Sequence, residues 1–398
     1  MRRVLAIALA LAACKARRDL RRDDPMPESP PSDAGAGDAR AAQADAAKRW
    51  PELAGLPSAE AVRVVALPMR SDMPRFNVGG PVIADDVAVV SSSQFGFAAI
   101  DWRRGALVWT KPAGLHVAPP VALRDTVVLI GDCFNPPDLP SGETLLGCVR
   151  VVTASGTDRS YTAIRGRRVD EFAAEPGPQQ LWLEGERAVR WRRGERAVAV
   201  DLVTGAATPA AADPPPVHVV YGSRAWDVAH RGERIVAHER GKLAWQTQNP
   251  YTALLGAVYL DEQAPMVRVA SVGAFGGRAE MNLLDIDATG SLHGQAAFPV
   301  PAIGLLGHAV DAVGNTAIAV RMDSSLRRDF VVGYAANALM MYVHALPEVP
   351  RADPVGLAIA PDAVLVFHDG DTFTVLPELS APPTAPGAPR APSQNPTP

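Results

Sequence analysis

Residues 98–110 read AAIDWRRGALVWT, two short apolar runs separated by an aspartate, two arginines and a glycine. The Asp-x-x-x-Gly spacing is typical of a tight turn, in which the aspartate accepts hydrogen bonds from nearby backbone amides and the glycine adopts a positive φ. The apolar runs on either side have the length of short strands. We therefore interpret Asp101 and Gly105 as the turn of a β-hairpin, and we expect Trp109 to end the second strand and pack into the seam between adjacent sheets.

This stretch recurs along the chain. At a shift of 100 residues, Asp101 and Gly105 fall on Asp201 and Gly205, and at a shift of 136 residues GALVW recurs as GKLAW from Gly241. A period of about 40 to 50 residues with about four strands per unit indicates a β-propeller. We predict an all-β fold of about seven four-stranded blades, with six or eight blades allowed and an array of β-sandwiches as the structural alternative.

The copies AIDWRRGALVW, AVDLVTGA and GKLAW resemble the quinoprotein-like repeat, whose family includes pyrroloquinoline-quinone (PQQ) dehydrogenases and a propeller lipoprotein of the outer-membrane assembly machinery. The resemblance covers about residues 75–380 and weakens after about residue 250, where tryptophan no longer occurs. It implies one of two functions, a scaffold that binds a protein or ligand, or a quinoprotein oxidoreductase. Dehydrogenases of this kind usually carry adjacent cysteines above PQQ, whereas Cys133 and Cys148 are not adjacent. We therefore expect a scaffold that is not an enzyme and holds no cofactor, with the oxidoreductase as the alternative.

The N-terminus has the pattern of a signal peptide. Two arginines precede an apolar run over residues 4–13, which is too short for a transmembrane helix of about 20 residues. The run ends in LAAC, which resembles the lipobox of bacterial lipoproteins, with an ordinary secretory signal as the alternative. The resemblance implies cleavage before a diacylated cysteine. The motif consists of Leu11, Ala12, Ala13 and Cys14.

The expected organisation has four parts. Residues 1–13 form the signal peptide, and residues 14–49 form a lipid-anchored linker whose composition buries too little apolar surface to fold. Residues 50–380 form the propeller, and residues 381–398 form a proline-rich tail. Lys15, rather than an aspartate, follows the lipidated cysteine, and by the same resemblance this favours the outer membrane. We expect a Gram-negative cell envelope, with the protein facing the periplasm and contacting another envelope protein.

The two cysteines that remain after lipidation form an even pair. Cys133 and Cys148 flank an insertion rich in proline and glycine, CFNPPDLPSGETLLGC. Two free thiols are the alternative, which is unusual in a secreted protein. We predict a disulfide between Cys133 and Cys148.

The sequence contains no pattern that indicates catalysis or a metal site. It lacks His-Glu-x-x-His, Cys-x-x-Cys, Gly-x-Ser-x-Gly and phosphate-binding glycine motifs. His230 and His238 lie eight residues apart across a turn, where they could meet on neighbouring strands, but solvated or core histidines are the better interpretation. We interpret the basic clusters at residues 165–168 and 190–196 as solvated hairpin faces, with a site for an acidic partner as the alternative. The formal net charge of −4 argues against nucleic-acid binding.

Overall fold

The structure is a computed structural model of the 398-residue chain. It describes residues 48, 62–68, 79–114, 117–134, 144–166, 180–184, 186–191, 197–210, 217–221, 224–231, 233–248, 253–258, 266–275, 278–297, 302–311, 313–322, 329–346, 354–368 and 372–377. In this part of the chain, none of the helices combines the length and hydrophobicity that crossing a bilayer requires.

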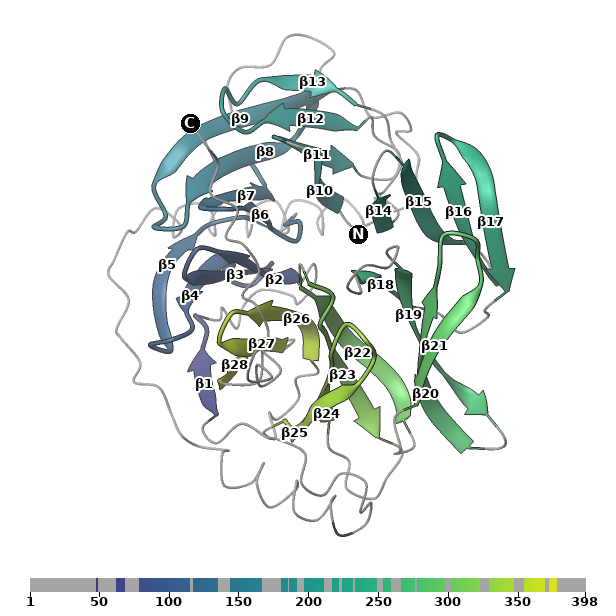
Figure 1. Ribbon diagram of the computed structural model, residues 1–398. Coiled ribbons are helices and arrows are strands. Elements are labelled where there is room, and N and C mark those ends of the chain that lie inside the picture. The colour runs from purple at the N-terminus through teal and green to yellow at the C-terminus, as the bar shows by residue number, and fades with distance from the viewer. Residues whose placement is uncertain are drawn as a thin grey trace, which may run out of the picture.

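Seven four-stranded antiparallel sheets are arranged around a central axis as the blades of a β-propeller (Figure 1), which confirms the predicted fold class. In blades 1 to 6 the chain starts at the innermost strand and ends at the outermost one, and the first strands of neighbouring blades are in contact around much of the ring. Closing the sheets into a ring lets neighbouring blades cover one another's faces, as the buried clusters of the described residues show for most pairs.

The strands of each blade have the following bounds. Blade 1 consists of β2 (Gly79–Ala84), β3 (Val87–Ser92), β4 (Gly96–Asp101) and β5 (Ala106–Lys111), and blade 2 of β6 (Val121–Leu123), β7 (Thr126–Gly131), β8 (Thr144–Thr153) and β9 (Asp158–Gly166). Blade 3 consists of β10 (Gln180–Glu184), β11 (Arg187–Trp191), β12 (Val198–Asp201) and β13 (Ala207–Pro209), and blade 4 of β14 (Val217–Tyr221), β15 (Arg224–Arg231), β16 (Arg234–Glu239) and β17 (Lys242–Gln248). Blade 5 consists of β18 (Ala253–Val258), β19 (Met266–Phe275), β20 (Arg278–Ile286) and β21 (Leu292–Ala297), and blade 6 of β22 (Ala302–Val310), β23 (Thr316–Met322), β24 (Asp329–Tyr334) and β25 (Met340–Ala345). Blade 7 consists of β26 (Pro354–Ala360), β27 (Ala363–His368), β28 (Thr372–Pro377) and β1 (Arg63–Ala66).

Blade 7 closes the ring with strands from both ends of the chain. The N-terminal strand β1 pairs antiparallel with β28, so that Arg63 lies opposite Val375 and Ala66 opposite Thr372. Sequence analysis did not identify β1, because its four residues, RVVA, carry no turn motif and their partner strand lies near the other end of the chain.

The hydrophobic core lies in the seams between blades. Among the described residues, most clusters of buried side chains combine residues from two neighbouring sheets; for example, Val89 of blade 1 packs in one cluster with Val127 of blade 2. The middle strands explain this arrangement, since β3, β7 and β27 are buried along their whole length and therefore consist of runs of apolar residues rather than alternating ones. Each fully buried aliphatic side chain contributes roughly 1.5 to 3 kcal/mol.

Tryptophans on outer strands contact the next blade at the turn that joins its third and fourth strands. The Trp109 indole nitrogen on β5 donates to the Ala154 carbonyl in blade 2 at 2.8 Å, and its ring lies so close to Gly156 that a Cβ there would come within 2.6 Å. Trp245 on β17 also packs against the last turn of the next blade, at Gly290 of blade 5. The prediction that Trp109 packs into a seam is therefore confirmed, and β5 continues two residues beyond it to Lys111.

The seam between blades 5 and 6 has a buried arginine. Arg268 on β19 is fully buried and forms a two-pronged ion pair with Asp285 on β20, with nitrogen–oxygen distances of 2.9 and 3.0 Å. It also donates to the Thr316 hydroxyl at 3.1 Å and to the carbonyls of Ala335 and Ala336 in blade 6. This network pairs the buried charge and joins both sheets, which explains how a seam without tryptophan is held.

We predict that Trp109→Ala destabilises the fold far more than Val108→Ala does. Removing the indole leaves a cavity beside Gly156, and we expect a loss of about 2 to 3 kcal/mol, below the range for a fully buried tryptophan because Trp109 is half-buried. Val108 is exposed on the same strand, so its loss should be within about 0.5 kcal/mol. The free energy of unfolding of both variants is measured in urea. Equal losses would show that the contact of Trp109 with blade 2 does not stabilise the seam.

Candidate binding face

One end of the propeller collects two turns from each blade. The turns that join the first strand to the second, and the third to the fourth, lie at the same end because the strands alternate in direction. We call this end the turn face, and the end with the connections between second and third strands the opposite face. The predicted hairpin turns at Asp101–Gly105, Asp201–Gly205 and Gly241 all belong to the turn face.

The aspartates of these motifs build the turns themselves. The Asp201 carboxylate accepts hydrogen bonds from the backbone N–H groups of Val203 and Thr204, at 3.0 and 2.6 Å, while the Gly205 N–H donates to the Asp201 carbonyl at 2.9 Å. Gly205 has a φ of 71°, as the motif requires. Hydrogen bonds from Thr204 lower the pKa of Asp201 below its ordinary value. The interpretation of this motif as a hairpin turn is confirmed.

The corresponding turn of blade 5 holds its aspartate even more tightly. Burial would raise the pKa of Asp287, but hydrogen bonds from Thr289, Ser291 and His293 outweigh it and lower the pKa to about 2. The two backbone bonds measure 2.8 Å from Thr289 and 3.0 Å from Ser291. A carboxylate that is ionised and occupied in this way is poorly suited to proton transfer near neutral pH.

Blades 7 and 1 are joined on this face by charged side chains. Arg103 donates to Asp362 of blade 7 at 2.8 Å and also pairs with Asp86. The Trp102 indole nitrogen donates to the other oxygen of Asp362 at 3.0 Å, and Arg63 of β1 donates to the backbone carbonyls of Trp102 and Arg103. Burial raises the pKa of Asp362, but the bonds from Trp102 and Arg103 lower it overall. This part of the turn face is therefore charged but internally paired.

The other part of the turn face presents aliphatic side chains to solvent. Five exposed residues stand in these turns or within two residues of them, and they belong to four consecutive blades, 3 to 6. We call them the apolar tips: Val203, Leu243, Leu292, Val313 and Leu339. Val203 is 78% exposed and Leu339 65%. Turns are normally polar, so a row of such residues on one face is typical of a binding surface.

Sequence analysis missed the apolar tips, although their signal was present. Each is an aliphatic residue inside or directly beside a turn motif, as in DLVTG at Val203, GKL at Leu243 and DAVG at Val313. Turn residues are expected to be polar unless they have a binding function. Their clustering depends on which turns share a face, and that follows only from the blade topology.

An open depression of about 530 Å³ lies at the propeller axis. It is formed by the first strands of five blades, mostly by residues close to the turn face, and all its lining residues are apolar. They are Pro81, Val82, Ile83, Val121, Ala122, Leu181, Trp182, Leu183, Ala309, Val310, Leu357, Ala358 and Ile359. The volume is within the range of small-molecule sites.

The described residues contain no group of three or more histidine, cysteine, aspartate or glutamate side chains suited to a metal ion. His230 and His238 do not face one another, since His238 lies opposite Asp227 and His230 opposite Ile235. Arg190, in the second predicted basic cluster, is fully buried rather than solvated. The lipobox residues, from Leu11 to Cys14, lie outside the described part of the chain.

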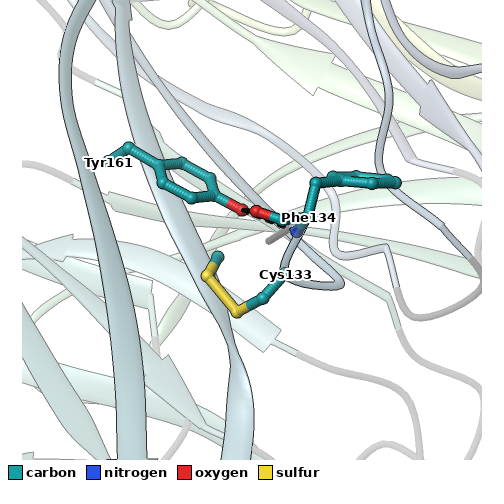
Figure 2. Close-up of a disulfide and its surroundings, with 4 residues drawn as sticks. Cys133, Phe134 and Tyr161 are labelled. Carbon is teal, nitrogen blue, oxygen red and sulfur yellow. Dashed lines mark hydrogen bonds between the residues drawn. A yellow bond between two sulfur atoms is a disulfide. The ribbon is translucent and has the colours of Figure 1, made fainter. Parts of the chain in front are cut away.

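Cys133 and Cys148 form a disulfide (Figure 2). It lies toward the opposite face of blade 2, because Cys133 follows β7 at the connection between the second and third strands. Cys133 follows β7 directly and Cys148 lies within β8, so the bond joins both sides of the insertion. Beside it, the Phe134 N–H donates to the Tyr161 hydroxyl at 2.9 Å, and the Arg150 guanidinium lies 5.1 Å from the centre of the Tyr161 ring. The disulfide therefore fastens the start of the insertion to β8, with Tyr161 on β9 holding the residue that follows Cys133.

No protein-family model matches the chain, and no curated protein matches it. Among solved structures, the chain is similar to the computationally designed Ika8 protein, with 10% identity over 78% of this chain and 98% of that one and a TM-score of 0.46. It is similar to BamB from Moraxella catarrhalis, with 16% identity over 75% and 84% and a TM-score of 0.35, and to the N-terminal domain of Nup159, with 12% identity over 80% and 97% and a TM-score of 0.42. Similarities at this level do not extend to function.

We predict that the disulfide contributes about 3 kcal/mol to stability, because closing a loop of 15 residues restricts the unfolded chain by roughly that amount. The double variant Cys133→Ser/Cys148→Ser should melt at a lower temperature but keep the circular dichroism spectrum of the propeller. Alkylation and mass spectrometry of the native protein, before and after reduction, test the bond directly. Alkylation of both thiols without reduction would refute it.

Proposed function

We propose that this protein is a lipid-anchored lipoprotein of a Gram-negative cell envelope, and that its propeller is an interaction scaffold that binds through the turn face. The observation that carries the proposal is the row of apolar tips over blades 3 to 6. Their side chains are largely exposed, although burying one such side chain fully is worth roughly 1.5 to 3 kcal/mol. A surface with several of them on one face gains free energy when a partner covers it.

The rigidity of the turns supports the same proposal. Asp201 and Asp287 fix the turns that carry or adjoin Val203 and Leu292 with several hydrogen bonds each, so these tips lose little conformational freedom on binding. Binding costs are lowest when the contacting groups are already held in place. The charged part of the face, where Arg103 pairs with Asp86 and Asp362, would border the contact as a polar rim.

The proposed subcellular location rests on the sequence. The LAAC motif supports a lipid on Cys14, and Lys15 supports sorting to the outer membrane, with the propeller in the periplasm and another envelope protein within reach. No observation on the described residues favours a quinoprotein oxidoreductase, so we propose no second function and no catalytic step.

We predict that Cys14→Ala abolishes lipid attachment. The substitution removes the sulfur that would carry the diacylglycerol, so the variant should incorporate no labelled palmitate and should either remain uncleaved or leave the detergent phase. Ala12→Gly keeps a small residue in the motif and serves as the control, with labelling expected to stay within twofold of the natural sequence. Absence of label from the natural sequence would leave only an ordinary secretory signal.

We predict that the turn face makes most of the contacts in the native envelope. A photo-reactive amino acid at position 203 or 339 should give adducts at least five times more often than one at position 231 or 233. Arg231 and Glu233 are also exposed but flank the β15–β16 connection on the opposite face. Adducts of any class, protein or lipid, count in this comparison. Equal or greater yields from positions 231 and 233 would contradict the proposed binding face.

A further inference from the structure

Both ends of the folded chain leave the propeller at the turn face. Strand β28 runs from the opposite face to the turn face, where Pro377 lies opposite Ala363, next to the turn at residues 361–362. Strand β1 begins there too, since Arg63 contacts the backbone of Trp102 and Arg103 in the last turn of blade 1. Strand β1 therefore starts, at Arg63, on the same face as the apolar tips.

One of the tips has the chemistry of a residue at a membrane interface. Leu243 is exposed at the β16–β17 hairpin, and Arg240 and Lys242, both also exposed, come directly before it in the Arg-Gly-Lys-Leu turn. Arg240 and Gly241 have φ values of 52° and 76°, and a side chain at Gly241 would meet no atom within 4 Å, so the hairpin projects into open space. A leucine beside two cations matches a bilayer surface, with its anionic headgroups above an apolar interior.

The remaining tips extend this surface over neighbouring blades. Val203 lies one blade before Leu243, Leu292 one blade after it, and Val313 and Leu339 one blade further. Arg268 donates to the carbonyls of Gly314 and Ala335, so the turns that carry Val313 and Leu339 are fixed to one buried side chain. The tips therefore form an arc held by rigid turns along one face.

We propose that the arc of apolar tips rests on the membrane surface to which the N-terminus is anchored, with the propeller lying turn face down on the bilayer. The inference rests on the proposed lipid anchor, because single aliphatic side chains bind membranes weakly. The anchor holds the propeller beside the bilayer, so the apolar tips meet the membrane surface at a high effective concentration. Even a weak contact is then formed much of the time. The anchor keeps the propeller near the membrane, and the apolar tips determine which face of the propeller contacts it.

The test uses the mature lipoprotein in vesicles that contain phosphatidylglycerol. Photo-reactive amino acids are placed singly at positions 243, 292 and 339, and at positions 108 and 233 as controls. Val108 is an exposed aliphatic residue outside the arc, on the outer strand of blade 1, and Glu233 lies on the opposite face. We expect phospholipid adducts from the first three positions at least fivefold above both controls, as measured by mass spectrometry.

Two variants test the cause of the orientation. Leu243→Asp should lower the phospholipid adducts from position 339 at least threefold, whereas Val108→Asp should leave them unchanged. Lys242→Gln should lower them in vesicles with phosphatidylglycerol but not in vesicles of phosphatidylcholine alone. Leu243, Val108 and Lys242 are all exposed, so the three variants should fold, and unchanged circular dichroism verifies this.

Equal phospholipid adducts at all positions, or no effect of Leu243→Asp, would overturn the inference. Protein adducts from positions 203 and 339 in the native envelope, without phospholipid adducts in vesicles, would also overturn it but would leave the proposed scaffold intact. A chain that fails to acquire lipid would not reconstitute into vesicles at all, and that outcome contradicts the proposed anchor instead.

Discussion

The closure of the ring is the constraint on which the rest of this structure depends. A propeller buries its core in the seams between blades, so an open ring would expose one face of each terminal blade and the edge of β28. Four residues, Arg63–Ala66, complete that edge, and Arg63 also holds the last turn of blade 1. Because β28 ends and β1 begins at the turn face, closure also decides where both chain ends leave the fold.

The turns of the same face show how a structural motif leaves room for a binding surface. The Asp-x-x-x-Gly turn uses the aspartate side chain, the backbone amides and the glycine conformation, as at Asp201 and Gly205. The side chain of the middle residue of the motif, Arg103 or Val203, is not needed by the turn and is exposed, so it is free to vary, whereas Trp102 and Leu202 before it are buried. Blade 1 has Arg103 there, which pairs with Asp86 and Asp362, whereas blade 3 has Val203. One fold can therefore carry charge on one part of a face and aliphatic side chains on another.

Sequence predicted those features that depend on local chemistry. The turns at Asp101 and Asp201 were recognisable because a side chain and a glycine must stand at fixed spacing, and Trp109 because a large residue after such a turn packs against the next blade. The pairing of β1 with β28 was not predictable, since no local signal connects the two ends of the chain. The weak repeat signal after residue 250 has a physical reason as well: Arg268 and Asp285 hold a seam there, and no repeat motif encodes a buried ion pair.

The position of the chain ends relative to the apolar tips links fold and function. If the segment after Cys14 entered on the opposite face, contact between the tips and the anchoring membrane would require the chain to pass around the rim of the propeller. The start of β1, beside the Arg103 network, and the arc lie on one face, so the proposed anchor and the proposed contact would favour the same orientation. In that proposed orientation the opposite face, with the Cys133–Cys148 disulfide, points away from the bilayer.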